Sequence, residues 1–358
     1  MHDFLIIGGG VAGLSAGARL AGLGDVLLLE GEAQLGYHAS GRSAALYEAD
    51  YGAPATVALA RASGEELAEM GVLSPRGFLA VAQAHEEAAF EKDCADLHMR
   101  RIAPDEAQAI IPILNLDRVA FAAHTDAAQN IDTDLMLQTY ARRLRERGGT
   151  IRTGTPVAAI RRNAEGWTVT LEGDGEEVRT RRLVNAAGAW ADRIAALAGL
   201  PRIGLKPLRR SIAQLPAPEG HDIRAWPMLF GAGETWYAKP EAGKWLVSPA
   251  DEDLVEPHDA WADDMVLAEG LARYEEMVTE PVTRVETSWA GLRSFAPDRT
   301  LVLGPDPLEP SFLWCAGQGG QGFLSAPGAA RVMEEVAGGD PSGFLPEIIA
   351  QLSPARLR

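Results

Sequence analysis

The sequence predicts an α/β protein with a second domain of α+β character. Near residue 10, a short apolar run leads into a glycine-rich turn and a helical pattern, and the same order recurs near residue 317. Between them, residues 201–295 are richer in Pro and Trp and contain short strand-like runs. The alternation of strands and helices indicates a parallel, Rossmann-like sheet, and the intervening stretch indicates an interleaved antiparallel sheet.

The first thirty residues carry a strand–turn–helix–strand pattern. Its elements are expected at residues 4–7, 8–10, 11–23 and 26–29. Gly8, Gly10 and Gly13 have the G-x-G-x-x-G spacing. Glycines so spaced permit a tight turn, let backbone N–H groups approach a pyrophosphate, and let the helix pack closely on the strand. Glu30 ends the second strand, where a carboxylate binds the ribose hydroxyls of an adenosine.

The register of these elements predicts a dinucleotide site rather than a purely structural turn. An acid at Glu30 disfavours a 2′-phosphate, so FAD or NAD is expected rather than NADP. The motif alone does not distinguish these two. A second turn, GQGGQG at 317–322, follows an apolar strand and opens a helix. The positive end of that helix would stabilise a ring that gains negative charge on reduction.

Composition narrows the class of protein. A chain of 358 residues can bury a large core and is expected to form two domains. The formal net charge of −17 argues against a nucleic-acid surface, and two cysteines, Cys94 and Cys315, give neither a disulfide framework nor a metal site. No apolar run reaches membrane-spanning length, and the first strand leaves no room for a signal peptide. We expect a cytoplasmic enzyme, with peripheral membrane contact left open.

The remaining elements follow from apolar periodicity and turn residues. Residues 31–52 are expected to form a loop that wraps a cofactor. Helices are expected at 55–71, 85–99, 103–111, 132–147, 191–198, 264–277 and 322–336. Strands are expected at 77–82, 119–123, 151–161, 167–172, 177–184, 211–215, 235–239, 245–248 and 312–316. The predicted cofactor domain comprises 1–50, 130–200 and 296–358, and the predicted substrate domain comprises 51–129 and 201–295.

Four stretches, in this order, resemble the FAD-dependent D-amino-acid oxidase (DAO) superfamily over nearly the whole chain. They are GGGVAG with Glu30, GYHASGRSAA, VNAAGAW, and WAGLRSFAPD with the GQGGQG turn. Within the superfamily, NIDTD, WPML, YAKPEAG and SPADEDLVEPHD are most similar to bacterial D-arginine dehydrogenases. Relatives in the superfamily also oxidise glycine, sarcosine, proline and hydroxy acids.

The resemblance implies FAD, held non-covalently, as the cofactor. Cys315 matches no tethering motif and is expected to be a buried structural thiol. His38 is likewise expected to be structural rather than catalytic. The residues implied for cofactor binding are Gly8, Gly10, Val11, Ala12, Gly13, Glu30, Ser40, Gly41, Arg42, Ser43, Ala44, Val157, Ala187, Gly188, Gly319, Gly320, Gln321 and Gly322.

The resemblance also implies a site for the carboxylate of an amino acid. Arg293 matches the superfamily's carboxylate-binding arginine, and Arg210 matches a second arginine of the D-arginine dehydrogenases. Tyr51 and Tyr237 match tyrosines that line the pocket there. Arginine suits this task because its planar fork of donors binds both oxygens of a carboxylate. The alternative is that these are surface arginines and core tyrosines.

Two departures from the D-arginine dehydrogenases concern the substrate's side chain. Phe78 stands where they carry an acid, and Leu46 stands where they carry a histidine. A buried cation without its carboxylate would cost several kcal/mol, so arginine is expected to be a poor substrate and apolar side chains to be preferred. Glu48, in the same loop as Leu46, leaves open a replacement charge.

The sequence thus predicts oxidative deamination of D-amino acids to 2-oxo acids and ammonia, by hydride transfer from Cα to flavin N5. The first alternative is oxidation of a 2-hydroxy acid or a secondary amine on the same fold; a hydroxy acid would need a nearby base. NAD-dependent dehydrogenation and FAD binding without turnover are further alternatives. The electron acceptor, whether oxygen, a quinone or an electron carrier, does not follow from the sequence, nor does the oligomeric state. No metal and no nucleic-acid partner are expected.

Overall fold

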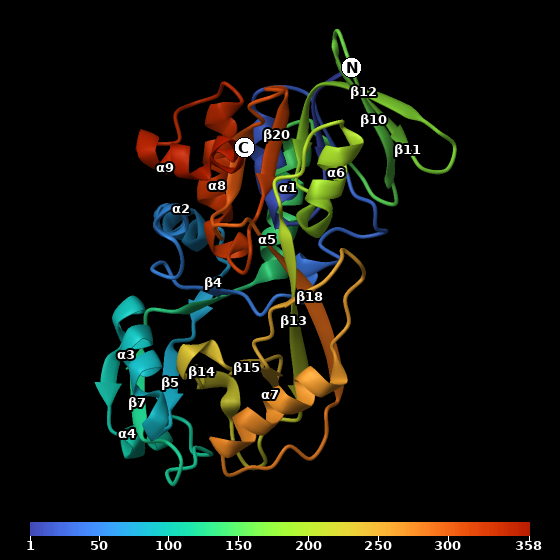
Figure 1. Ribbon diagram of the computed structural model, residues 1–358. Helices are drawn as coiled ribbons and strands as arrows, with labels where there is room; N and C mark the ends of the chain where they lie inside the picture. The colour runs from blue at the N-terminus through green and yellow to red at the C-terminus, as the bar shows by residue number, and fades with distance from the viewer.

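The computed structural model describes residues 1–358 as two sheets with their helices (Figure 1). The first sheet has eight strands, in the order β10-β11-β12-β1-β2-β9, with β20 also paired to β12, and β19 to β20. Its centre is parallel, because β1 pairs in parallel with both β12 and β2, and β20 with β12. The strands are β1 (His2–Ile7), β2 (Val26–Leu29), β9 (Thr150–Arg152), β10 (Val157–Asn163), β11 (Gly166–Leu171), β12 (Glu177–Asn185), β19 (Val302–Pro305) and β20 (Phe312–Ala316).

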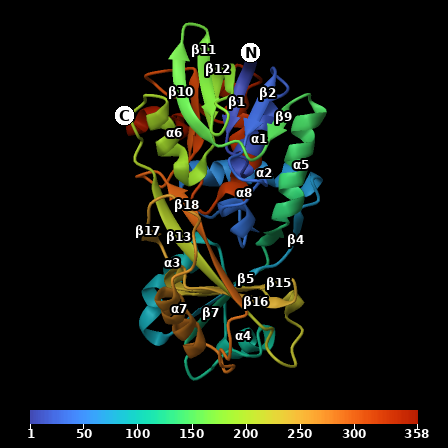
Figure 2. The same cartoon turned by 90° about the vertical axis from the view of Figure 1, so that its right-hand side faces the viewer.

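Helices cover both faces of this first sheet. They are α1 (Val11–Leu20), α2 (Pro54–Glu69), α5 (Thr133–Glu146), α6 (Ala191–Leu197), α8 (Gly322–Val336) and α9 (Pro346–Leu352). Figure 2 shows α5 and α6 on opposite sides of the sheet. Side chains alternate between two buried clusters, so Leu28 faces the cluster of α1, α2, α5 and α8, whereas Leu27 faces the cluster of α6 and β11. The all-apolar β2 is therefore explained by burial on both faces.

The second sheet has nine strands and is mainly antiparallel. Its order is β17-β13-β16-β15-β14-β5-β7-β6, with β18 on β13. Its strands are β5 (Phe78–Ala82), β6 (Arg100–Ile102), β7 (Phe121–Thr125), β13 (Lys206–Leu215), β14 (Met228–Gly231), β15 (Tyr237–Glu241), β16 (Lys244–Ser248), β17 (Asp253–Leu254) and β18 (Thr287–Phe295). The helices α3 (Glu87–Asp96), α4 (Pro104–Ile110) and α7 (Asp264–Glu276) pack on it. The two sheets confirm the predicted fold class, while the exact domain boundaries stay a prediction.

A long antiparallel pair connects the two parts of the molecule. β13 and β18 are paired over nine residues, from Lys206 opposite Phe295 to Gln214 opposite Thr287, and both views show them running from one sheet toward the other (Figures 1 and 2). A small sheet at the same level joins β3 (Leu46–Tyr47), β8 (Gln129–Ile131) and β4 (Leu73–Pro75). The β13–β18 pair places residues of the second sheet beside the second glycine-rich turn, where Gly319 packs against Phe295.

Several expected elements differ from the structure for local reasons. The single strand expected at 151–161 is two strands, β9 and β10, because Gly154 has a positive φ of 64° and Pro156 interrupts the pairing. The helix expected at 85–99 begins as a 3₁₀ turn and ends at Asp96, shortly before His98, whose φ is 50°. The capping role of Asp132 is confirmed, since its carboxylate accepts a hydrogen bond from the N–H of Leu135.

Four strands of the second sheet were not expected from the sequence. They are the short β6 and β17, and β14 and β18, although WPML and WAGLRSF lie within or next to the last two. No helix of the chain combines the length and the apolar character needed to cross a lipid bilayer.

Candidate functional site

Two adjoining cavities lie where the glycine-rich turns meet the β13–β18 pair. The first, of about 270 Å³, is lined by the start of α1, residues 39–51, β13, β18 and the 318–324 turn. The second, of about 350 Å³, is lined by the ends of β1 and β2, residues 30–42 and residues 186–197. The residues that line both are Gly10, Ala39, Ser40, Arg42, Ala186, Gly188, Gly291 and Leu292. The cavities therefore form one continuous site for a long ligand with two different ends.

Glycines of the first turn are required by close backbone contacts. Gly8 has a φ of 115°, and a Cβ there would overlap the carbonyl oxygen of Ala186. At Gly13 a Cβ would overlap the carbonyl oxygen of Gly8. Gly8 lines the second cavity, whereas Gly13 lines neither and acts through the packing of α1 on β1. The structure thus assigns different roles to the two glycines.

Glu30 is held in the second cavity by backbone donors. Its Oε2 accepts a hydrogen bond from the N–H of Gly9 at 2.7 Å, and its Oε1 accepts one from Glu32 at 2.9 Å. Nearby, α1 begins at Val11, its N-cap residue Gly10 has no side chain to cap it, and its first turn holds no acid; Ser40 Oγ accepts from the N–H of Val11 at 3.0 Å. A fixed carboxylate and a helix N-terminus without an acid are the features that bind the ribose and pyrophosphate of a dinucleotide.

Arg42 lines both cavities, but protein partners take most of its donors. Its Nη1 donates to the carbonyl oxygens of Ala260 at 2.8 Å and Ala290 at 3.0 Å, and its Nη2 pairs with Asp259. Tyr37 O accepts from Nε at 3.2 Å. The predicted position beside a cofactor is therefore combined with a structural role, which is to tie the 39–42 loop to the second sheet.

The second glycine-rich turn closes the first cavity. Gly319, with a φ of 54°, packs so tightly against the ring of Phe295 that no Cβ fits there. A Cβ at Gly320 would lie 2.9 Å from Nη1 of Arg293. Gln321 was expected to cover the cofactor but lines neither cavity; its Nε2 instead donates to the carbonyl oxygen of Tyr51 at 2.6 Å.

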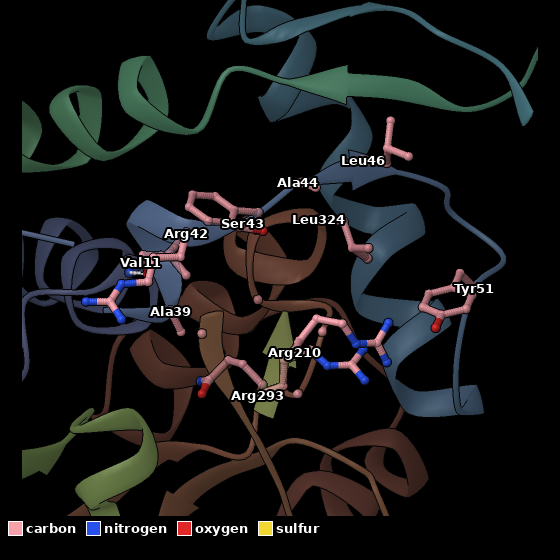
Figure 3. A pocket seen from close by; sticks show the side chains of 18 of the residues that line it. Val11, Ala39, Arg42, Ser43, Ala44, Leu46, Tyr51, Arg210, Arg293 and Leu324 are labelled. Carbon is pink, nitrogen blue, oxygen red and sulfur yellow. Dashed lines mark hydrogen bonds between the residues drawn. The ribbon is translucent and has the colours of Figure 1, made fainter. Parts of the chain in front are cut away.

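The two predicted carboxylate-binding arginines lie on one face of neighbouring strands. Arg210 on β13 is opposite Gly291, and Arg293 on β18 is opposite Leu208, so the arginines are diagonal neighbours. Both line the first cavity, and Figure 3 shows their side chains close together near Tyr51. The side chain of Arg210 lies over the ring of Tyr237, with Cζ 5.9 Å from the ring centroid.

Tyr51 also faces an acid. Its hydroxyl donates to Oε2 of Glu234 at 3.1 Å, and both residues line the first cavity. Burial, and next the negative charge of Glu234, raise the pKa of Tyr51 far above its ordinary value. The hydroxyl is therefore a stable hydrogen-bond donor at neutral pH. Sequence reasoning identified the tyrosine but missed its partner.

A glutamate outside the cavity lining pairs with both arginines. Glu252 accepts from Nη2 of Arg293 and, at 3.4 Å, from Nη2 of Arg210, and it also pairs with Arg299. Although burial opposes it, the pKa of the Glu252 carboxyl lies below its ordinary value because Arg299, Arg293 and Arg210 stabilise the charged form. Burial and the charge of Arg210 lower the pKa of Arg293, which remains a cation at neutral pH.

One wall of the first cavity is largely apolar. Leu46 and Phe78, both expected there, are joined by Leu97, Met228 and Phe230, which sequence reasoning missed. The rings of Phe78 and Phe230 meet edge to face with centroids 5.7 Å apart. β14 brings Met228 and Phe230 to this wall because it pairs in parallel with β5, and the alternation of Met228 and Phe230 is the signal that the sequence offered.

Glu48 lines this wall but is nearly closed off. The residue is 6% exposed, its Oε1 accepts from the N–H of Asp50 at 3.2 Å, and its Oε2 is buried without a partner. Burial raises the pKa of the carboxyl, and the nearby charge of Asp50 acts in the same direction. Little of the carboxylate faces a ligand in this arrangement.

The remaining predicted residues divide by cavity. Gly13, Gly41 and Gln321 line neither cavity; Gly41 is required because a Cβ there would lie 2.5 Å from the carbonyl oxygen of Gly36. Those in the first cavity alone are Val11, Ala12, Ser43, Ala44, Gly319, Gly320 and Gly322. Those in the second alone are Gly8, Glu30, Val157 and Ala187.

His38 and Cys315 occupy the surroundings of the site. His38 lines the second cavity, where its Nε2 lies 2.9 Å from Glu32 and its ring lies 4.5 Å from that of Trp190. Cys315 lines neither cavity, and burial raises the pKa of its thiol to about 12. These positions are those of supporting side chains.

Comparison with known proteins defines the class to which this site belongs. The family model described as FAD dependent oxidoreductase (DAO) matches residues 3–336. The chain therefore belongs to the DAO family of FAD-dependent oxidoreductases. The likeness to D-arginine dehydrogenases in particular stays a prediction.

Individual relatives are distant but cover the whole fold. Bovine (Bos taurus) FAD-dependent oxidoreductase domain-containing protein 1 is 24% identical over 93% of this chain and 80% of its own length. The structure of L-proline dehydrogenase from P. horikoshii superposes with a TM-score of 0.83 at 20% identity, over 99% of this chain and 97% of that one. Glycine oxidase from Geobacillus kaustophilus gives a TM-score of 0.82 at 22% identity, over 97% of both chains.

The residues present fit FAD, the cofactor of this family. Glu30, Gly8 and the start of α1 would hold the adenosine and pyrophosphate in the second cavity. The 39–44 loop and the 319–322 turn would hold the flavin in the first cavity, between the arginines and α1. The positive N-terminus of α8, which has no acid in its first turn, would favour the reduced, negatively charged ring.

Proposed function

We propose that the protein catalyses oxidative deamination of D-amino acids to 2-oxo acids and ammonia. The observation that supports this most directly is the pair Arg210 and Arg293, which lie side by side on β13 and β18 and face a cavity closed by the 319–322 turn. Two guanidinium groups there suit a carboxylate, and the apolar wall of the same cavity suits a side chain.

The chain's own residues would position the substrate. Arg210 and Arg293 bind the carboxylate, and Tyr51 and Tyr237 line the same cavity. FAD, when bound, supplies the acceptor for the hydride that leaves Cα. The lone pair of a neutral amine assists that loss, and the amine then gives up a proton to leave an imino acid. Water hydrolyses the imino acid to the 2-oxo acid and ammonia.

The side-chain wall supports apolar substrates over cationic ones. Leu46, Phe78, Met228 and Phe230 offer no partner to a guanidinium group. Glu48 is too enclosed to approach one without moving, since its Oε2 is buried. A cation placed there would lose its hydration without gaining a paired carboxylate.

A second candidate function is oxidation of a secondary amine, which would use the same carboxylate site. A solved relative named L-proline dehydrogenase supports this alternative. Oxidation of a 2-hydroxy acid is supported less, because it needs a base, no histidine lines the first cavity, and of the two carboxylates there Glu48 is buried and Glu234 is bonded to Tyr51.

The function is tested by anaerobic titration of the purified yellow protein with single amino acids, followed by the visible spectrum. Bleaching by D-leucine, D-phenylalanine or D-methionine, and little by D-arginine or the L forms, is expected. Bleaching by proline or sarcosine alone would replace the proposal with the second candidate. If none of the amines reduces the flavin, both candidate functions are excluded. Admitting air to the reduced protein then shows whether oxygen is the acceptor, or whether a quinone or carrier is needed.

A further inference from the structure

We infer that Glu252 is a positioning residue for substrate recognition: its carboxylate holds Arg210 and Arg293 so that both turn a free Nη1 toward the same point in the first cavity. The inference rests on the proposed function only in that the ligand carries a carboxylate. Glu252 itself does not line the cavity, and it contacts the two arginines through their Nη2 atoms.

The two guanidinium groups use Nη2 in the same way but differ at Nε, which in Arg293 is buried without a partner. Nη2 of both arginines reaches the same oxygen, Oε1 of Glu252. Arg210 further donates from Nε to the carbonyl oxygen of Asp251 at 2.9 Å. Nη1 of Arg210 and of Arg293 donates to no group of the chain and is not fully buried. One oxygen of an incoming carboxylate can therefore be bound by each Nη1.

The backbone that carries Glu252 is fixed. Asp251, its neighbour, is 8% exposed and accepts hydrogen bonds from the N–H of Ser211 at 2.6 Å and from its hydroxyl at 2.9 Å. Ser248 Oγ donates to the carbonyl oxygen of Ser211 at 2.7 Å and accepts from the N–H of Ala250 at 3.1 Å. The 248–252 loop is thus bound to β13, the strand that presents Arg210.

Glu252 also reduces the electrostatic repulsion between the two arginines. Arg210 and Arg293 have side chains only 10% and 16% exposed, so water screens their mutual repulsion poorly. Glu252 bridges them and also pairs with Arg299, whose guanidinium lies 3.9 Å from the ring centroid of Phe295. Without the carboxylate the two cations would be expected to separate, and their donors would no longer meet.

The test measures carboxylate binding separately from turnover. In the FAD-loaded protein, Glu252→Ala is expected to raise the Kd of 4-methyl-2-oxopentanoate, read from the visible spectrum of the flavin, by about tenfold or more. KM for D-leucine rises by the same factor, and kcat changes by less than about threefold. Glu252→Gln, which keeps an oxygen acceptor, lies between Ala and the wild type. Binding of 3-methylbutylamine, which lacks the carboxylate, stays unchanged.

Glu66→Gln is the matched control, because Glu66 bridges Arg19 and Arg143 at 2.8 and 2.7 Å away from both cavities. It is expected to leave the Kd unchanged. Unchanged or tighter binding of the 2-oxo acid in both Glu252 variants, with flavin content intact, would overturn the inference. If the wild type binds the 2-oxo acid but oxidises no amino acid, the proposed function fails while the role of Glu252 is still decided by the Kd. If Glu252→Ala loses its flavin, the isosteric Glu252→Gln decides.

Discussion

The two cavities of the site differ in which parts of the chain line them. The second is lined by Gly8, Glu30 and the 30–42 and 186–197 segments, and the two glycines that shape it, Gly8 directly and Gly13 through the packing of α1 on β1, come from one short stretch of chain. The first is formed by side chains that reach it from β13, β18, β14, β5 and the 39–51 loop. A substitution that disturbs the second cavity should therefore affect retention of the cofactor, whereas one at the arginines or the apolar wall of the first should affect choice and affinity of the substrate.

The largest effect is expected from Gly13→Val. Its branched side chain would overlap the carbonyl oxygen of Gly8, which is backbone and cannot turn aside, so α1 must move off β1. We expect loss of bound flavin, measured by absorbance of the purified protein, together with a lower Tm. Gly71→Val is the control, because nothing lies within 4 Å of a Cβ there. Gly71 also has a positive φ, so a modest drop in Tm with full flavin content is expected for it. Full flavin content in Gly13→Val would refute the comparison.

Next in size is Arg293→Ala in the first cavity. Removal of a buried charge that pairs with the substrate carboxylate costs about 2–5 kcal/mol, or roughly 30- to 4,000-fold in kcat/KM. Flavin content should stay near the wild-type value. Arg299→Ala, which removes a more exposed arginine outside the cavity lining, should lower kcat/KM less. Equal losses in both variants would mean that Arg293 has no special role.

Phe78→Glu should change specificity with a smaller loss of activity. A carboxylate at this wall would pair with a cationic side chain, so the ratio of kcat/KM for D-arginine to that for D-leucine should rise about tenfold or more. Phe78→Gln, of similar size but without charge, should not raise the ratio. A ratio that stays at the wild-type value in Phe78→Glu would show that the side chain of the substrate lies elsewhere.

The smallest effect concerns stability against pH. Because burial raises the pKa of Glu48 above its unfolded value, the folded protein binds the proton more tightly than the unfolded chain. Folding is therefore disfavoured progressively as pH rises from the unfolded pKa through the folded one. Glu48→Gln should raise Tm at pH 8 but not at pH 4. A difference in Tm that is the same at both pH values would contradict the assigned shift.

Local motifs predicted the second cavity better than the first. Gly8, Gly13 and Glu30 act through neighbours close in sequence or through the adjacent strand, so their spacing contained most of the information. Met228 lies in the apolar wall of the first cavity because β14 pairs with β5, where Met228 is opposite Phe78. The two residues are about 150 positions apart in the chain, and no local pattern encodes their pairing. Glu252 was missed because its significance depends on two arginines that meet only in the folded sheet.

The arginines and the side-chain wall differ in how their backbones are held. Arg210 and Arg293 lie on a nine-residue antiparallel pair, whereas Leu46 lies on a two-residue strand and Met228 on a four-residue one. In evolutionary terms, short strands and loops tolerate substitution more readily than a long ladder. Enzymes that diverge from such a gene would therefore change substrate by substitutions at a few residues of the wall. The arginines would continue to bind the carboxylate that all these substrates share.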